Sequence, residues 1–194
     1  MCSSSTAETT AGEQGSRGAR ETDSPLPPRI PAPLHSKTLV LGLGNPLLGD
    51  DGVGWRVVEQ VQARITRPEI EFDFHSGGGL SLMERLIGYT RAIIVDALNT
   101  GRQPQGTVSS FRLEDLPNDA QSHLASAHET TLQTALQVGR TMGAALPNDI
   151  RIVAIEAQNV YDFSEELSPA VASAVPKAVE LVIGQLGDQS TSDQ

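Results

Sequence analysis

From Lys37 onward the chain alternates between short apolar runs and stretches in which apolar residues recur at helical spacing. Apolar or alternating runs predict strands within five segments, 37–44, 69–76, 91–101, 106–113 and 150–158. Helices are predicted over 53–66, within 77–89, over 126–146 and over 168–186. Strands that alternate with helices predict an α/β domain. We expect a three-layer αβα architecture, with about five strands in a mostly parallel, twisted sheet and helices on both faces.

The last two predicted helices carry local signals for their ends. Ser126 and Glu129 have the spacing of a capping box, which would start the 126–146 helix at this point. Its buried face would hold Leu132, Ala135, Leu136, Gly139 and Met142. In the last helix Ser168 is a favourable N-cap and Pro169 a favourable first residue. Pro176 inside that helix is expected to kink it.

The two ends of the chain differ in composition from the rest. Residues 1–36 are rich in Ser, Thr, Gly and Pro and lack the apolar core of a secretory signal, so we expect a disordered tail. Residues 188–194 are predicted to be a disordered terminus, which leaves one domain over 37–187. No run approaches the ~18 consecutive apolar residues that indicate a membrane span.

Charge and cysteine content limit the classes of function. The chain carries 14 basic and 24 acidic residues, and residues 1–36 hold only three and four of these, so the rest keeps a net charge of −9. Such a surface repels phosphate backbones and argues against nucleic acid as a partner. Cys2 is the only cysteine, which excludes an internal disulfide or a cysteine-based metal cluster and fits a cytoplasmic protein.

The first predicted strand runs into a glycine-rich turn, GLGNPLLGDDGVG, that places Asp50 and Asp51 side by side before a helix. Leu47 stands where a dinucleotide fingerprint needs its third glycine, and no P-loop lysine follows, so nucleotide binding is disfavoured. One of the two aspartates, with Asp50 as the candidate, can cap the 53–66 helix, where a charge contributes about 0.3–1 kcal/mol. A second aspartate adds repulsion unless a cation or a shared proton relieves it.

Two further residues stand where an α/β sheet places its functional site, beyond the C-terminal ends of the strands. Asp96 directly follows the apolar run 92–95, where it either serves the site or caps the following loop. His128 falls in the first turn of the helix predicted from Ser126, where the helix dipole favours a neutral, metal-binding imidazole. The other histidines, His35, His75 and His123, lack comparable support.

Asp51, Asp96 and His128 form a nitrogen and oxygen ligand set that suits Ni, Zn, Mn or Fe rather than Cu(I). Three protein ligands leave coordination positions open for water or substrate. The residues by themselves therefore predict a transition-metal site at the mouth of an acidic α/β domain.

The segments GLGNPLLGDDGVG, AIIVDAL and SAHETTLQTAL, in this order and spacing, resemble the hydrogenase maturation endopeptidases. The resemblance covers roughly residues 37–187. It implies that Asp51, Asp96 and His128 bind metal and are catalytic, and that the chain removes the C-terminal extension of a nickel-loaded [NiFe]-hydrogenase large-subunit precursor. Nickel would be supplied by the substrate, with Zn or Cd able to substitute and no organic cofactor.

From this resemblance we expect a peptidase of the kind classed with aspartic-type endopeptidases, acting as a monomer on the large-subunit precursor and without nucleic-acid or membrane partners. Many members of the family have an aspartate where this chain has Ser76, and a tail like 1–36 is not part of the family's usual core.

Two alternative functions start from the same residues. The sequence GLGNP also opens peptidyl-tRNA hydrolases, but the histidine, the asparagine and the basic face that such an enzyme needs are missing here. A non-catalytic adaptor that senses nickel in the hydrogenase precursor would use the same three ligands as the peptidase.

Overall fold

The structure, a computed structural model, describes residues 37–115 and 131–187, and these form one five-stranded sheet in the order β2-β1-β3-β5-β4. Neighbouring strands pair in parallel except β4, which runs antiparallel to β5 at the edge of the sheet. The prediction of a five-stranded, mostly parallel sheet is confirmed. The strands are β1 (Thr38–Leu43), β2 (Ile70–His75), β3 (Arg91–Leu98), β4 (Val108–Arg112) and β5 (Asp149–Glu156).

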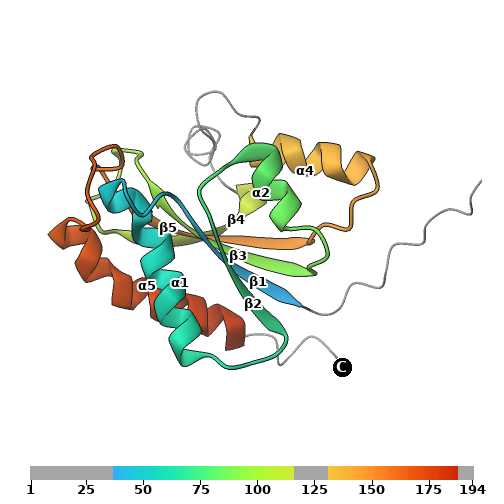
Figure 1. Cartoon of the computed structure of the whole chain (residues 1–194), viewed down its shortest axis with the longest axis horizontal. Coiled ribbons are helices and arrows are strands. Elements are labelled where there is room, and N and C mark those ends of the chain that lie inside the picture. The colour runs from blue at the N-terminus through green and yellow to red at the C-terminus, as the bar shows by residue number, and fades with distance from the viewer. Residues whose placement is uncertain (1–36, 116–130, 188–194) are drawn as a thin grey trace, which may run out of the picture. The chain divides into compact units, whose positions relative to one another are not determined.

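Helices cover both faces of this sheet, so the predicted three-layer architecture is also confirmed. Figure 1 shows α2 and α4 on one face and α1 and α5 on the other. Side chains alternate along each strand between two cores: Leu41 and Ile94 pack under α2 and α4, whereas Val40 and Ile93 pack under α1 and α5. The described helices are α1 (Val53–Arg64), α2 (Gly79–Arg85), α4 (Leu132–Thr141) and α5 (Pro169–Gly187), with the 3-10 turns η1 (Gly49–Gly52) and η2 (Leu113–Asp115).

Helix α4 is shorter than the sequence pattern predicts. It begins at Leu132, and the hydroxyl of its N-cap Thr131 accepts a hydrogen bond from the backbone N–H of Thr134. The predicted start at Ser126 is therefore wrong for this helix, and Ser126 and Glu129 themselves lie outside the described residues. The prediction that Met142 belongs to the buried face is also wrong, because the helix ends at Thr141 and Met142 is 81% exposed.

Helix α5 begins at Pro169, as predicted, and the carbonyl of Ser168 accepts the backbone N–H of Ala172. Pro176 lies on its exposed side and the helix continues through it to Gly187. Among the described helices, α5 is the one long and apolar enough to cross a membrane, with a mean hydropathy of 1.2. Its apolar side chains, such as Val175 and Val179, pack against the sheet, as expected for the core helix of an α/β domain.

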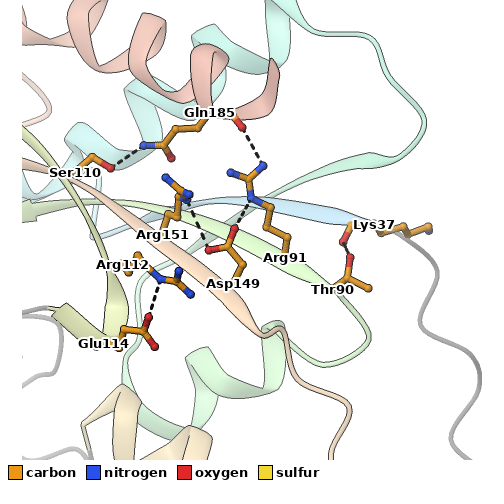
Figure 2. A network of polar contacts seen from close by, with 9 residues as sticks. All are labelled: Lys37, Thr90, Arg91, Ser110, Arg112, Glu114, Asp149, Arg151 and Gln185. Atoms are coloured by element: carbon orange, nitrogen blue, oxygen red, sulfur yellow. Dashed lines mark hydrogen bonds and ion pairs between the residues drawn. The ribbon is translucent and has the colours of Figure 1, made fainter. Parts of the chain in front are cut away.

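A polar network joins the C-terminal end of α5 to the start of β3 and β5 (Figure 2). The Nη1 of Arg91 donates to the carbonyl of Gln185 at 2.9 Å, and its Nε lies 2.9 Å from an oxygen of Asp149. The side-chain amide of Gln185 donates to Ser110 of β4 at 2.7 Å. A buried cation thus satisfies a helix-end carbonyl and a carboxylate together, and it closes the end of the sheet opposite the strand C-termini.

We predict that Arg91→Met lowers the free energy of unfolding by about 1–3 kcal/mol, because the carbonyl of Gln185 loses its buried donor and Asp149 keeps only the longer contact with Arg151, at 3.6 Å. The control is Arg64→Met, which breaks an ion pair with Glu180 whose side chains are 47% and 68% exposed. An exposed pair of this kind contributes less than about 1 kcal/mol. Denaturant unfolding measures both, and equal losses in the two variants would contradict the assignment.

Candidate active site

The turn between β1 and α1 is built on glycines because its backbone passes too close to other segments for any side chain. A Cβ on Gly44, whose φ is +111°, would lie 2.0 Å from the carbonyl oxygen of Asp51. A Cβ on Gly54 would lie 2.3 Å from the carbonyl oxygen of Val95. Glycine alone permits both approaches. The first turn of α1 therefore rests directly on the C-terminal ends of β1 and β3.

Asp51, in η1, is held by the turn that carries it. The backbone N–H of Asn45 donates to its Oδ2 at 2.6 Å. Burial raises the pKa of the Asp51 carboxyl above its usual range, and the hydrogen bond from Asn45 opposes this shift. The carboxyl is therefore easier to protonate, or more in need of a cation, than an ordinary surface aspartate.

Asp96 lies in β3 on the side of the sheet that faces α2 and α4, because it alternates in phase with Ile94 and Leu98. The strand continues to Leu98, so Asp96 is placed within the strand and not at its last residue. Only 4% of Asp96 is exposed. Burial raises the pKa of its carboxyl well above the usual range, and the negative charge of Asp51 raises it further, against the backbone N–H of Ala97.

The carboxyl of Asp51 lies near enough to Asp96 for its charge to raise the Asp96 pKa, so these two predicted residues belong to one region of the fold. Two neighbouring carboxyl groups in a partly dry site share a proton or bind a cation. Among the residues that the structure describes, no third His, Cys, Asp or Glu joins them in a group that could hold a metal ion. His128, the predicted third ligand, lies outside the described residues, so its place in the site stays a prediction.

Asp50 has a structural role in the fold, but it is not the capping of the 53–66 helix that the sequence predicts. The N-cap of α1 is Gly52, without a side-chain hydrogen bond, so the prediction that Asp50 caps this helix is wrong. Asp50 is fully buried, and its carboxylate accepts the backbone N–H and the hydroxyl of Ser168 at 2.7 and 2.9 Å, and the side-chain amide of Gln105 at 3.0 Å. It therefore neutralises the N-terminal end of α5 and ties that helix to η1.

His75 and Ser76, to which the sequence assigned no role, close β2 next to the same turn. The carbonyl of His75 accepts the backbone N–H of Gly44 at 3.0 Å. The Nε2 of its imidazole lies 3.0 Å from the hydroxyl of Ser81 in α2. His75 thereby helps to fix the glycine turn, whereas Ser76 is exposed.

Sequence reasoning missed Glu156, a buried carboxylate at the end of β5. Its Oε1 accepts the backbone N–H groups of Thr100 and Gly101 at 2.9 and 2.8 Å, and the Thr100 hydroxyl lies 2.8 Å from its Oε2. The signal was available, because Glu156 ends an apolar strand as Asp96 nearly does. Its bonds hold the loop that follows β3, so its role is structural.

A pocket of about 260 Å³ opens on the α2 and α4 side of the sheet, and its lining includes Thr100, Phe111 and Glu156 but neither Asp51 nor Asp96. Its wall includes Leu98, two residues after Asp96 on β3, and Ala154, the register partner of Asp96 on β5. A second pocket of about 330 Å³, lined by Gln133 and Arg140 among others, includes neither aspartate. Neither of these two pockets is therefore lined by the aspartate pair.

For Asp50→Ala we predict a loss of about 1–3 kcal/mol in the free energy of unfolding, because three donors of Ser168 and Gln105 lose a buried acceptor. Asp115→Ala, which removes an exposed aspartate, is the matched control and should change stability by less than about 0.5 kcal/mol. Chemical denaturation of both variants tests this, and an unchanged Asp50→Ala protein would show that the tie to α5 is dispensable.

A second prediction concerns pH. Because the folded-state pKa of Asp96 is raised, folding disfavours its ionised form. The metal-free protein therefore loses stability as pH rises from the ordinary aspartate pKa of 3.8 through the pKa of the folded state. Asp96→Asn should escape this loss and be more stable than the wild type at pH 7, with the difference vanishing below pH 3.8. Urea unfolding across pH with a chelator measures it; a difference independent of pH would contradict it.

The comparisons with known proteins identify the family to which the chain belongs. A family model described as hydrogenase maturation protease matches residues 55–185. The hydrogenase expression/formation protein HupD of Rhodobacter capsulatus is 30% identical over 159 residues, covering 81% of this chain and 74% of its own length. A putative hydrogenase maturation protease of Methanocaldococcus jannaschii is 29% identical over 154 residues, covering 76% and 95%.

A solved structure gives the same answer for the fold. The hydrogenase maturating endopeptidase HybD from E. coli superposes with a TM-score of 0.69 at 27% identity, over 79% of this chain and 94% of HybD. The family model covers more than half of the chain, and its match runs from α1 to α5. The chain belongs to the hydrogenase maturation protease family.

Proposed function

We propose that this protease removes the C-terminal extension of a [NiFe]-hydrogenase large-subunit precursor and recognises that precursor by its inserted nickel. Family membership makes the chain a peptidase. The observation that carries the proposal is the meeting of Asp51 and Asp96 at the C-terminal ends of the strands, in a chain of this family.

The chemistry of the two carboxyl groups supports a cation as part of the substrate. Each has a raised pKa, and the charge of Asp51 contributes to the shift at Asp96. A divalent ion presented by the precursor would bind an oxygen of each carboxylate and relieve the repulsion between Asp51 and Asp96. His128 would add the nitrogen donor that, with two carboxylates, suits nickel or zinc.

Hydrolysis then needs a water molecule, a base and room for the peptide. In the proposed reaction, a carboxylate of the pair or the substrate's own metal activates water, which adds to the scissile carbonyl. The carbon–nitrogen bond breaks and the proton taken from water goes to the leaving amine. The 260 Å³ pocket, whose wall includes the strand neighbours Leu98 and Ala154, is the space that we propose for the polypeptide on one side of the scissile bond.

Family membership argues against one of the two alternative functions raised by the sequence. The match to hydrogenase maturation proteases argues against a peptidyl-tRNA hydrolase, with which the glycine turn shares only its first residues. A non-catalytic nickel sensor would use the same three ligands, so it remains an outcome of the activity test below.

We predict that the purified protein cuts a nickel-loaded large-subunit precursor and leaves the metal-free precursor and peptidyl-tRNA intact. Asp51→Ala and His128→Ala should each abolish cleavage while keeping the fold, because removal of a ligand at the mouth of the sheet opens no core cavity. Gel electrophoresis of the precursor with intact-mass determination of the product measures cleavage.

Matched controls are Asp115→Ala and His123→Ala, which remove the same side-chain types outside the proposed ligand set and should retain wild-type rates. Equal cleavage of the metal-free precursor would discard nickel recognition while leaving the peptidase assignment intact. Tight binding of the loaded precursor without any cleavage would favour the sensor.

A further inference from the structure

Three large apolar side chains are exposed at the edge of the domain that carries the aspartate pair. Leu47 is 49% exposed, Tyr161 is 81% exposed and Phe163 is 90% exposed. We call these three residues, two aromatic rings and one leucine, the aromatic patch. Exposed aromatic rings are costly in water unless a partner covers them, and such side chains supply the strongest anchors of protein interfaces.

The aromatic patch is held together by backbone pairing between two loops. Leu48, before η1, forms a parallel bridge with Ser164 in the loop between β5 and α5. The N–H of Ser164 donates to the carbonyl of Leu47 at 3.1 Å, and the N–H of Gly49 donates to the carbonyl of Ser164 at 2.6 Å. In this register Leu47 and Phe163 are neighbours on adjacent segments, so their side chains contribute to one surface.

The same hydrogen bonds fix the aromatic patch relative to the candidate catalytic residue. Leu48 accepts the backbone N–H of Asp51 at 3.1 Å, and Leu47 donates its own N–H to the side chain of Asn45 at 3.0 Å. Asn45 in turn donates its N–H to the Asp51 carboxylate. A protein seated on the aromatic patch would therefore be held at a fixed distance from the aspartate pair.

The loop between β5 and α5 also determines the chemistry of the partner. Asp162, Glu165 and Glu166 alternate with or follow the two aromatic residues and are exposed. Their carboxylates form no hydrogen bond or ion pair with any residue that the structure describes. Apolar anchors bordered by uncompensated acids complement an apolar hollow that is bordered by lysine or arginine side chains.

Exposure alone does not distinguish this surface. Met142 is also 81% exposed, but it lies at the C-terminal end of α4, on the face of the sheet opposite α1 (Figure 1). Within residues 37–115 and 131–187, the aromatic patch alone combines exposed rings, bordering acids and a direct backbone connection to Asp51. Met142 therefore provides a matched control of equal exposure.

We propose that the aromatic patch docks on the folded body of the large-subunit precursor, on an apolar hollow with a basic rim, while the C-terminal segment enters the site at Asp51 and Asp96. This inference rests on the proposed function, because it takes the precursor as the substrate. In this arrangement the aromatic patch supplies binding energy outside the site at Asp51 and Asp96, and it orients the scissile bond.

The test compares the double variant Tyr161→Ser/Phe163→Ser with Met142→Ser, using the nickel-loaded large-subunit precursor as the probe. The double variant should weaken binding of the precursor and raise KM about tenfold or more, with kcat within about twofold of the wild type. Met142→Ser should match the wild type in both constants. Because the side chains of Tyr161, Phe163 and Met142 are exposed, the variants should unfold at the wild-type temperature.

Charge reversal gives an independent measurement on the same surface. Glu165→Lys/Glu166→Lys should slow association with the precursor, and the loss should shrink as salt rises. If the wild type cuts the precursor and the aromatic double variant does so with unchanged KM, the docking proposal is wrong and the proposed function stands. If the wild type binds without cutting, the proposed function fails, and the affinities of the same variants still decide the docking proposal.

Discussion

The close approach of the α1 backbone to the ends of β1 and β3 sets the positions of the other parts of the site. At Gly44 and Gly54 a single added carbon would lie within 2.0–2.4 Å of a backbone carbonyl oxygen. Because these contacts are backbone to backbone, they cannot relax by a change of rotamer. They hold η1 over the strand ends, so that the charge of Asp51 acts on the carboxyl of Asp96, which is buried on β3.

Asp50 and Asp51, which are adjacent in this turn, have different roles. Asp50 points to the start of α5, where three hydrogen bonds satisfy its charge inside the protein. Asp51 accepts one backbone hydrogen bond, from Asn45, which opposes but does not cancel the effect of burial, so the pKa of its carboxyl stays raised. Their adjacency couples stability to function, because the bonds that anchor Asp50 also fix the residue next to it.

Local sequence determined most of the architecture. The apolar runs that became β1 and β3 are buried at every position, as parallel strands covered on both faces must be, and the helical repeats of α1 and α5 needed no tertiary information. Asp51 and Asp96 were predictable as site residues for the same reason, because a charged side chain next to an apolar strand is costly to bury in a core. Helix ends were less predictable: Thr131 and not Ser126 caps α4, and Met142 leaves the buried face because the helix has already ended.

Only the tertiary structure decided what each charged group does. Asp50 and Asp51 have nearly the same local sequence, and their partners, Ser168 for one and Asp96 for the other, lie far along the chain. Glu156 ends a strand much as Asp96 does, yet the loop after β3 saturates its carboxylate with hydrogen bonds. The sequence by itself determined which residues lie at the mouth of the sheet, because hydrophobic periodicity is local. Whether a carboxylate there is satisfied or left with a raised pKa depends on donors and charges that only folding brings within reach.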